Sequence, residues 1–133
     1  MSKLSNTVLI WNRACGNDAL RSLPGDRALA DMIGAHGLAM NGGVLHAVEC
    51  LAPEQLSDAC SGYAYFGLQA IASLLSRAKT ILDEDDDLEN NEQRLDRQYA
   101  KIIPDDEALV ERFEAHLHSH PSDFSPLRPI DMR

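Results

Sequence analysis

The sequence predicts an all-α fold of about six or seven helices in a single compact domain. Apolar residues recur at spacings of three and four, which is the period of a helix with one buried face. No stretch alternates apolar and polar residues over several positions, as a half-buried strand does. The chain has 133 residues, of which 44% are hydrophobic, and this is enough for one core. Because aromatic residues make up only 5%, that core is expected to consist mainly of Leu, Ile, Val and Ala.

Turn-forming residues set the expected limits of the first helices. Apolar residues at helical spacing predict a helix over about 5–15, and Gly16 is expected to end it. Asp26 is expected to cap a second helix, which should end around Gly34 to Gly37, since glycine commonly follows the end of a helix. Asn41-Gly42-Gly43 is the strongest break in the chain, and a short apolar helix over 44–48 should follow it.

Residues 53–82 are expected to form two helices. Pro53 suits the first turn of a helix, and Gly62 and Gly67 interrupt the pattern that follows. The second helix has the most regular apolar stripe in the sequence, formed by Leu68, Ile71, Ala72, Leu75, Ala78 and Leu82. Leu74 and Ile81 widen it, which indicates either a central helix or a homodimer.

Two further helices are expected on either side of Pro104. Leu88, Leu95, Tyr99 and Ile102 mark the first, and Asp105 or Asp106 can cap the second. The inner face of the second helix is expected to hold Leu109, Val110, Phe113 and Leu117. Residues 1–120 are thus predicted to form the helical domain, and the Pro-rich residues 121–133 a tail that lies along the surface or hangs free.

Charge is distributed unevenly along the chain. Residues 1–50 hold four acidic and four basic side chains. Residues 51–107 hold thirteen acidic and five basic side chains, and residues 108–133 hold four acidic and three basic ones. The net charge of −9 therefore comes almost entirely from the middle region. Within it, seven carboxylates fall in ten positions: Asp83, Glu84, Asp85, Asp86, Asp87, Glu89 and Glu92. A sequence pI near 4.8 argues against direct binding to nucleic acid or an anionic membrane.

Three interpretations of the acidic run remain open. Carboxylates before a helix can cap it and interact with its dipole, so the run could be a solvated loop that caps the helix near Leu88. It could instead bind a basic partner, with Glu89, Glu92 and Asp96 on one helical face and Asp105 to Glu107 alongside if the last two helices are antiparallel. A divalent-cation site is the third interpretation, although the run lacks the central Gly of a calcium loop.

The C-terminal histidines are the best candidates for a metal site. His116 and His120 are one helical turn apart, a spacing at which two imidazoles can reach one ion. Glu49 or Asp123 would have to supply a third ligand. The dipole at a helix C-terminus also favours histidine without any metal, so no cofactor is assigned.

The sequence contains no catalytic signature. Cys15, Cys50 and Cys60 form no CxxC pair and are expected to be small buried residues in a reducing compartment. His36 and His46 could supply imidazole, but no nucleophile stands beside a base in a known pattern. No apolar stretch is long enough for a signal peptide or a membrane span, so a cytoplasmic protein is expected.

The order of several short motifs is similar to that of a known family. The motifs are Asn41-Gly42-Gly43 before a short helix, Phe66-Gly67-Leu68-Gln69-Ala70-Ile71-Ala72 before Ala78 and Leu82, Leu95-Asp96-Arg97-Gln98-Tyr99, and Ser122-Asp123-Phe124. Over residues 1–124 this resembles the bacterial DNA-mimic-protein-like family, largely a domain of unknown function. The resemblance implies an all-helical fold. For the best-known member it also implies dimerisation and an acidic face that occupies the DNA-binding surface of a transcription factor.

The leading hypothesis is a non-enzymatic interaction protein that presents the carboxylates of residues 83–92, with Asp96, to a basic surface such as that of a DNA-binding regulator. One alternative is a metal-binding protein or metal-dependent hydrolase that uses His116 and His120. Another is an immunity-type inhibitor of a toxin, which the same acidic surface would serve equally well.

Overall fold

The all-α prediction is confirmed. The structure is a computed structural model that describes residues 5–16 and 23–132, and these contain seven α-helices, two short 3-10 helices and no strand. The α-helices are α1 Asn6–Cys15, α2 Pro24–Gly42, α3 Val44–Cys50, α4 Pro53–Tyr65, α5 Gln69–Asp83, α6 Leu88–Ile102 and α7 Asp106–Ser119, and the 3-10 helices are η1 Pro121–Asp123 and η2 Pro129–Met132.

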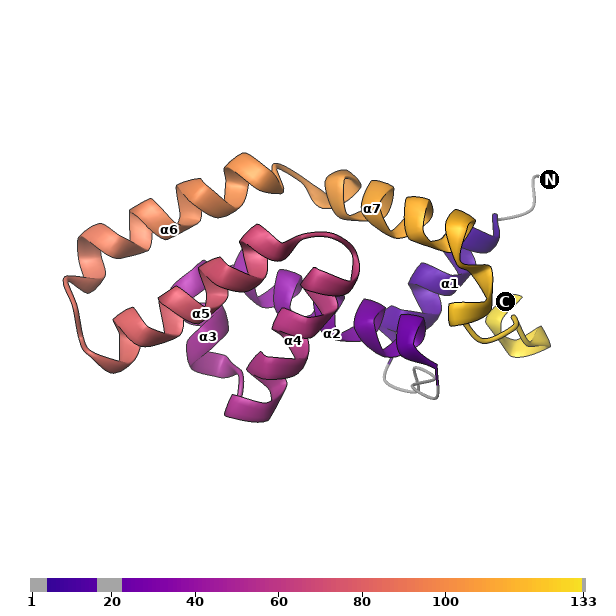
Figure 1. Ribbon diagram of the computed structural model, residues 1–133, viewed down its shortest axis with the longest axis horizontal. Coiled ribbons are helices and arrows are strands. Elements are labelled where there is room, and N and C mark those ends of the chain that lie inside the picture. Colours follow the sequence, from indigo (N-terminus) through magenta and orange to yellow (C-terminus); the bar gives the residue numbers. More distant parts are fainter. Residues whose placement is uncertain (1–4, 17–22, 133) are drawn as a thin grey trace.

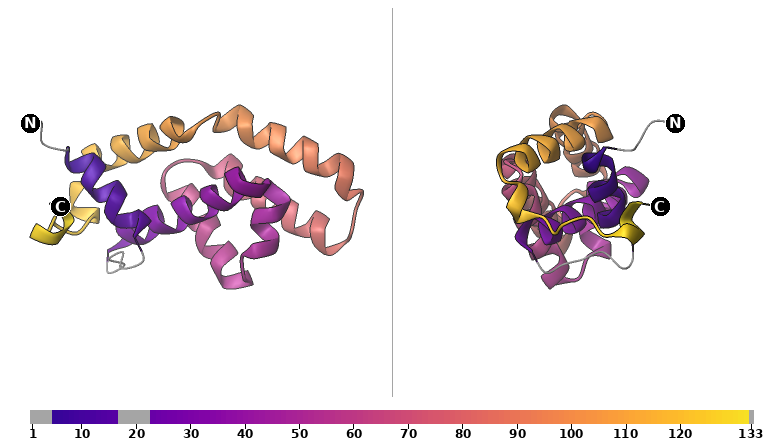
Figure 2. Two further views of the ribbon diagram at one scale, coloured as in Figure 1. Left: turned by 180° about the vertical axis from the view of Figure 1, so that it is seen from behind. Right: turned by 90° about the vertical axis from the view of Figure 1, so that its right-hand side faces the viewer.

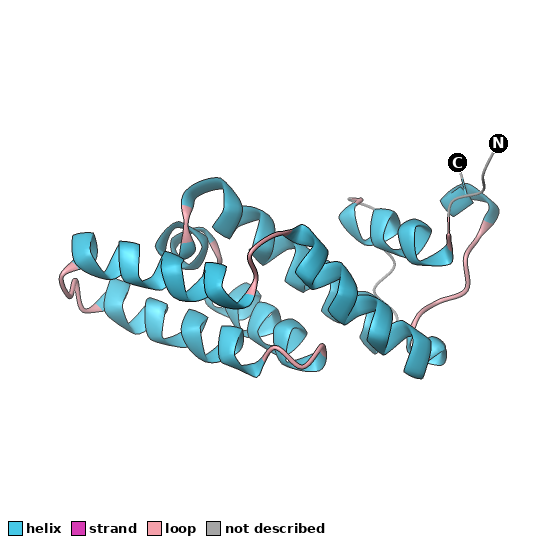
Figure 3. Ribbon diagram, turned by 90° about the horizontal axis from the view of Figure 1, so that it is seen from above, coloured by secondary structure: helices cyan, strands magenta, loops and turns pink. Residues whose placement is uncertain are grey.

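The helices form an elongated molecule (Figure 1). α2 to α5 pack together as one body, and α6 and α7 follow one another end to end along one side of it (Figures 1 and 2). The view from above shows the turn between α5 and α6 at one end, with α1 and the C-terminal segment at the opposite end (Figure 3). The acidic run and the Pro-rich segment are therefore far apart in space.

α2 is the central helix of the body and contacts α1, α3 and α4. Leu29 and Met32 on its inner face are fully buried. Where α4 crosses it, a Cβ on Gly62 would lie only 2.7 Å from the carbonyl oxygen of Ala28, so glycine is needed for this close approach. Gly62 is thus inside α4, and only Gly67, with φ of 80°, lies at the break before α5.

The predicted end of the second helix is wrong, because α2 continues through Gly34 and Gly37 to Gly42. Both glycines are exposed, with nothing near the space that a Cβ would occupy. Each costs about 1 kcal/mol relative to alanine. Ala35 and Ala39 on the opposite face are buried, so the packed face of α2 continues beyond both glycines. This tertiary packing outweighs the low helix propensity of glycine.

The wide apolar stripe of α5 is covered within a single chain. Ile71, Leu74 and Leu75 are at most 1% exposed, because α3, α4 and α6 all pack against this helix. The stripe therefore reflects a central position in the fold. It gives no independent support to a homodimer, which stays a prediction.

The segment after residue 120 is folded onto the domain. Phe124 is 5% exposed and its ring packs against that of Phe113, with 5.5 Å between centroids. Ser125 is buried, and η2 contacts α1. A free tail is therefore excluded for the described part of this segment, since Phe124 belongs to the hydrophobic core.

A buried ion pair holds α1, α2 and the C-terminal segment together. The guanidinium of Arg13 donates to Oδ1 of Asp26 at 2.9 Å and to the carbonyl oxygen of Ser125 at 2.9 Å. Oδ2 of Asp26 accepts the backbone N–H of Ser125 at 2.8 Å. Asp26 was expected to cap α2, but the N-cap is Leu23 and the Asp26 carboxylate instead faces Arg13.

Candidate functional site

The main candidate is the surface that we call the acidic turn, residues 83–92, which joins α5 to α6 and includes the first turn of α6. Its seven carboxylates are all exposed and no basic residue lies among them: Asp83, Glu84, Asp85, Asp86, Asp87, Glu89 and Glu92. Among the described residues only one of them forms an ion pair, Asp83 with Lys79 at 3.0 Å. The acidic turn forms one end of the molecule (Figure 1). It therefore presents concentrated negative charge to solvent.

The carboxylates of the acidic turn do not cap α6 by hydrogen bonds. Asp87 is the N-cap, but its side chain accepts no backbone N–H, and the side-chain amide of Asn90 donates to it instead, at 3.0 and 3.2 Å. Asp85 and Asp87 have positive φ values of 51° and 43°, a region that Asp enters more readily than most residues. Of the capping interpretation, only an electrostatic interaction of these carboxylates with the dipole of α6 therefore remains.

Asp96 is bound within the fold, unlike the other acids grouped with it in the sequence analysis. Its Oδ1 accepts the backbone N–H of Val44 at 2.8 Å, and the residue is half-buried. Gly43 precedes α3 with φ of 96° and has no side chain with which to cap it. Asp96 therefore caps α3 from α6, and we leave it out of the proposed binding surface.

The negative charge does not continue along α6. This helix holds three acids, Glu89, Glu92 and Asp96, against three bases, Arg94, Arg97 and Lys101. Asp105 to Glu107 lie beyond its far end, because α6 and α7 run end to end and not antiparallel (Figure 1). The 15 residues of α6 correspond to a length of about 22 Å at 1.5 Å per residue. Asp105 to Glu107 therefore do not join the acidic turn.

The C-terminal histidines bind other side chains in the fold. Nε2 of His116 lies 3.1 Å from Oδ2 of Asp123, and the same oxygen accepts the hydroxyl of Tyr65 at 2.5 Å. These hydrogen bonds, that of Tyr65 first, lower the pKa of Asp123. The ring of His120, one residue past α7, stacks on His116.

The fold brings together only some of the residues that the sequence suggested as metal ligands. His116, His120 and Asp123 lie close to one another, whereas Glu49 is on α3 in another part of the fold. No group of three or more His, Cys, Asp or Glu side chains in the described part of the chain has the arrangement of a metal site.

A buried chain of polar side chains crosses the helical body, and sequence reasoning missed it. His36 Nδ1 lies 2.7 Å from the hydroxyl of Tyr99, and that hydroxyl lies 2.7 Å from the hydroxyl of Tyr63. Nε2 of His36 lies 2.7 Å from Oδ1 of Asp106, whose side chain is at the surface. Burial raises the pKa of both tyrosines. His36 follows Leu29 and Met32 at helical spacing, which was the available signal that it faces inward.

This chain joins four helices, since its members come from α2, α4, α6 and α7. His36 is 5% exposed, and Tyr63 and Tyr99 are at most 3% exposed, so all three side chains are buried in the helical body. These hydrogen bonds connect the four helices, so we assign a structural role to the polar chain.

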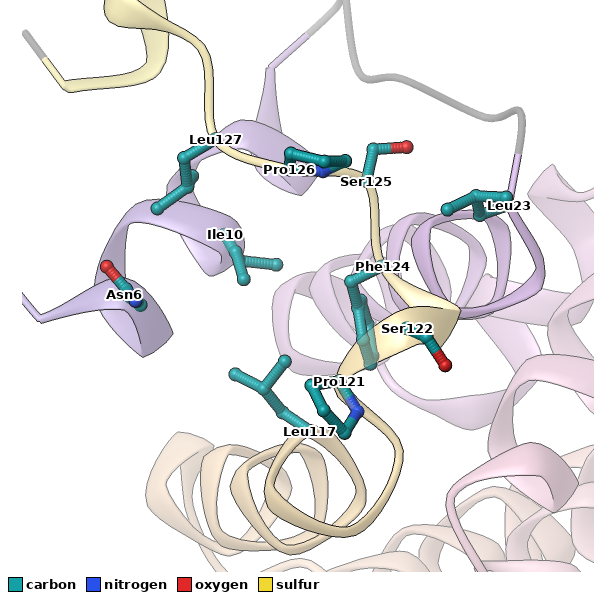
Figure 4. Close-up of a pocket in the computed structure, with 10 residues that line it drawn as sticks. All are labelled: Asn6, Ile10, Leu23, Leu117, Pro121, Ser122, Phe124, Ser125, Pro126 and Leu127. Carbon is teal, nitrogen blue, oxygen red and sulfur yellow. The ribbon is translucent and has the colours of Figure 1, made fainter.

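A cavity of about 740 Å³ lies between α1, the end of α7 and the C-terminal segment (Figure 4). It is lined mainly by apolar side chains and contains no titratable one: Asn6, Ile10, Leu23, Leu117, Pro121, Ser122, Phe124, Ser125, Pro126 and Leu127. Ser122 and Ser125 carry hydroxyl groups, but the lining offers no acid or base that could activate them, so the cavity gives no support to a catalytic site.

The prediction that the cysteines are buried is wrong, since none of the three is fully buried. Cys15 and Cys50 are exposed, and Cys60 is half-buried. Cys15 and Cys50 are each the last residue of a helix, where apolar periodicity no longer determines which side chain faces the core.

Comparison with known proteins assigns the family. A family model described as DMP19-like protein matches residues 22–125, which is most of the chain. The chain belongs to the DMP19-like family. The match contains α2 to α7, the acidic turn and the buried Phe124. A search of curated proteins and a search of solved structures each returned no match.

The DMP19-like region includes the motifs on which the family resemblance was based, from Asn41-Gly42-Gly43 to Phe124. Within the described residues, no helix has both the length and the apolar character that a membrane span requires.

Proposed function

We propose that this DMP19-like protein is a non-enzymatic interaction protein whose acidic turn occupies the basic surface of a DNA-binding regulator in the cytoplasm. The observation that carries the proposal is the exposure of all seven carboxylates in residues 83–92, of which one has an ion-pair partner among the described residues. A surface of this kind is electrostatically complementary to one that binds phosphates.

The charge density of the acidic turn supports a DNA-like role. Duplex DNA carries one negative charge per about 1.7 Å of its axis, and a protein that binds it gains affinity through Lys and Arg contacts to phosphates. Seven carboxylates in ten residues offer those same basic side chains acceptors of the same charge. Carboxylates also form strong, often bidentate, hydrogen bonds with arginine.

The distribution of charge limits the extent of the proposed contact. Because the acids and bases of α6 balance, the acidic turn is a compact anionic end and not a long row. It would therefore contact a local basic patch on its partner, such as one half of a DNA-binding groove. Arg94 and Arg97 lie next to it and would disfavour a partner whose basic surface extends along α6.

The test is a capture experiment at low salt with two charge-matched variants. The first changes Asp85, Asp86, Asp87, Glu89 and Glu92 to Asn or Gln. The control changes five exposed acids elsewhere to Asn or Gln: Glu49, Glu54, Asp58, Glu111 and Glu114. Both variants lose five negative charges, so they differ only in where the charge is removed.

The proposal predicts that the wild type and the control capture a DNA-binding protein from lysate, that rising salt releases it, and that duplex DNA displaces it. The acidic-turn variant should fail to capture it. Capture of a toxin that DNA does not displace would favour the immunity-type function. Equal capture by all three proteins would refute a role for the acidic turn.

A further inference from the structure

α3 carries a thiol and an imidazole in contact at the surface. Sγ of Cys50 lies 3.6 Å from Nε2 and 3.7 Å from Nδ1 of His46, one helical turn earlier. Cys50 is exposed, so its sulfur is open to a reagent in solution. The pair lies outside the acidic turn, and the proposed interaction function does not use it.

The other two cysteines have different surroundings. Sγ of Cys60 is 3.5 Å from the carbonyl oxygen of Ala72, to which it donates, and 3.9 Å from Oγ of Ser76. Although Cys15 is exposed as a residue, partial burial of its thiol raises the pKa of that group, which disfavours the reactive thiolate. In the described residues, Cys50 is the cysteine with an imidazole within hydrogen-bonding distance.

Gly42 of the Asn41-Gly42-Gly43 motif leaves the space that the imidazole of His46 occupies. A Cβ on Gly42 would lie 2.5 Å from Cγ and from Cδ2 of His46, so the ring occupies the space that a side chain at residue 42 would need. The hydrogen bond from Val44 to Asp96 fixes the start of α3 on α6. The ring of His46 therefore fills the space beside Gly42, on a helix whose start is anchored to α6.

We propose that Cys50 is a site of thiol–disulfide exchange with small neutral or cationic disulfides, and that His46 acts as its general base. A thiol reacts through its thiolate, and an adjacent imidazole can accept the proton. Exposed Glu49 beside the thiol, together with the net charge of −9, disfavours anionic disulfides.

Thiol–disulfide exchange at Cys50 conserves protons and electrons and needs no additional oxidant or reductant. His46 accepts the Sγ proton, and the sulfur of Cys50 attacks one sulfur of the disulfide. The S–S bond of the reagent breaks as the new S–S bond forms, and the departing thiolate takes up the proton from the imidazolium. The Cys50 sulfur is oxidised and the departing sulfur is reduced.

The experiment treats the full-length protein at pH 7 with one equivalent of 2,2′-dithiodipyridine, a neutral disulfide. Release of pyridine-2-thione gives the rate, and peptide mapping identifies the modified cysteine. We expect Cys50 to be modified first. His46→Gln should slow the reaction roughly tenfold, below the usual range for general-base catalysis because the pair is exposed to water. His118→Gln, which removes an exposed histidine from α7, should leave the rate unchanged.

Gly42→Ala provides a second test in which the imidazole is kept. Because a methyl group there displaces the ring, this variant should also slow modification of Cys50, and circular dichroism should show retained helix in each variant. Preferential modification of Cys15 or Cys60, or an unchanged rate in His46→Gln, would overturn the proposal.

The charge preference is tested with two aliphatic disulfides of opposite charge. Cystamine should modify Cys50 faster than 3,3′-dithiodipropionate at low salt, and added salt should reduce the difference. Equal rates at low salt would overturn the preference for neutral or cationic disulfides.

Discussion

Asp96 accepts the backbone N–H of Val44 at 2.8 Å, so an acid on α6 caps a helix that begins 52 residues earlier in the chain. Gly43 at the N-cap has no side chain to do this. Asp96 therefore has a structural role, while the carboxylates of the acidic turn are exposed to solvent.

Asp96→Ala is expected to lower the free energy of unfolding by about 1 kcal/mol, the usual cost of removing an N-cap acceptor. Asp96→Asn keeps an oxygen that can accept the Val44 N–H, so it should lose less. Urea denaturation of the wild type and both variants measures the difference. Equal stability of the alanine variant and the wild type would show that the cap contributes nothing.

Arg13→Met is expected to lower the free energy of unfolding by about 3–5 kcal/mol, because it leaves Asp26 buried without its cation. The side chains of both residues are 4% exposed, so water cannot replace the lost partner well. The C-terminal segment should also become easier to cleave near Phe124 in limited proteolysis, since Arg13 donates to Ser125 and Pro126.

A double change provides the control for this ion pair. Arg13→Met with Asp26→Leu removes the unpaired charge and should recover part of the stability lost in the single variant. A double variant no more stable than Arg13→Met would show that packing around the guanidinium, and not the buried charge, dominates.

Much of the fold could be predicted from residues that start or end a helix through their immediate neighbours in the sequence. Pro104 separates α6 from α7, and Asp105 caps α7 by accepting the N–H of Ala108, as the sequence indicates. Both effects depend on neighbouring residues, so they can be predicted without the tertiary structure. The exposure of the acidic turn is also predictable from neighbouring residues, because seven carboxylates within ten positions cannot be buried together.

Features that depend on distant residues could not be predicted in this way. α2 passes Gly34 because Ala35 and Ala39 are buried against other helices, and Phe124 enters the core through Phe113. The contact between Asp96 and Val44 joins two helices far apart in the sequence. Helical spacing identifies which face of a helix is buried, but it does not identify the helix or segment that packs against that face.

Tyr99→Phe is expected to lower the free energy of unfolding by about 1–3 kcal/mol, because the buried groups of His36 and Tyr63 both lose their shared partner. Tyr63→Phe removes one hydroxyl and leaves Tyr99 bound to His36, so its effect should be smaller. The double variant should lose less than the sum of the two single losses. Thermal and urea unfolding measure all three, and additive losses would contradict a connected network.

The hydrogen bonds to Asp123 predict a pH dependence of stability. Tyr65 and His116 lower the pKa of this carboxyl in the folded protein. Its contribution to stability should therefore be present above the unfolded pKa of about 4 and be lost as the pH falls through the lower folded value. The Asp123→Asn variant has no ionisable group at this position, so it lacks this pH-dependent contribution to stability. The difference in free energy of unfolding between wild type and Asp123→Asn should thus shrink below pH 4, and a constant difference would contradict the assignment.

Neutralising Asp85, Asp86, Asp87, Glu89 and Glu92 is expected to leave the free energy of unfolding unchanged or to raise it by up to about 1 kcal/mol at low salt. The physical reason is that these carboxylates repel one another and none accepts a backbone N–H of α6. The capping interpretation predicts the opposite sign, because loss of a cap destabilises a helix by about 1 kcal/mol.

Urea denaturation at low salt and in 1 M salt separates the two interpretations. A gain that disappears in 1 M salt, where the Debye length is about 3 Å, would show that the acidic turn is a source of repulsion in the folded protein. A sequence that keeps such a feature at a cost in stability is typical of a functional site. A loss of stability at both salt concentrations would assign the carboxylates to the helix and remove the main support for the interaction surface.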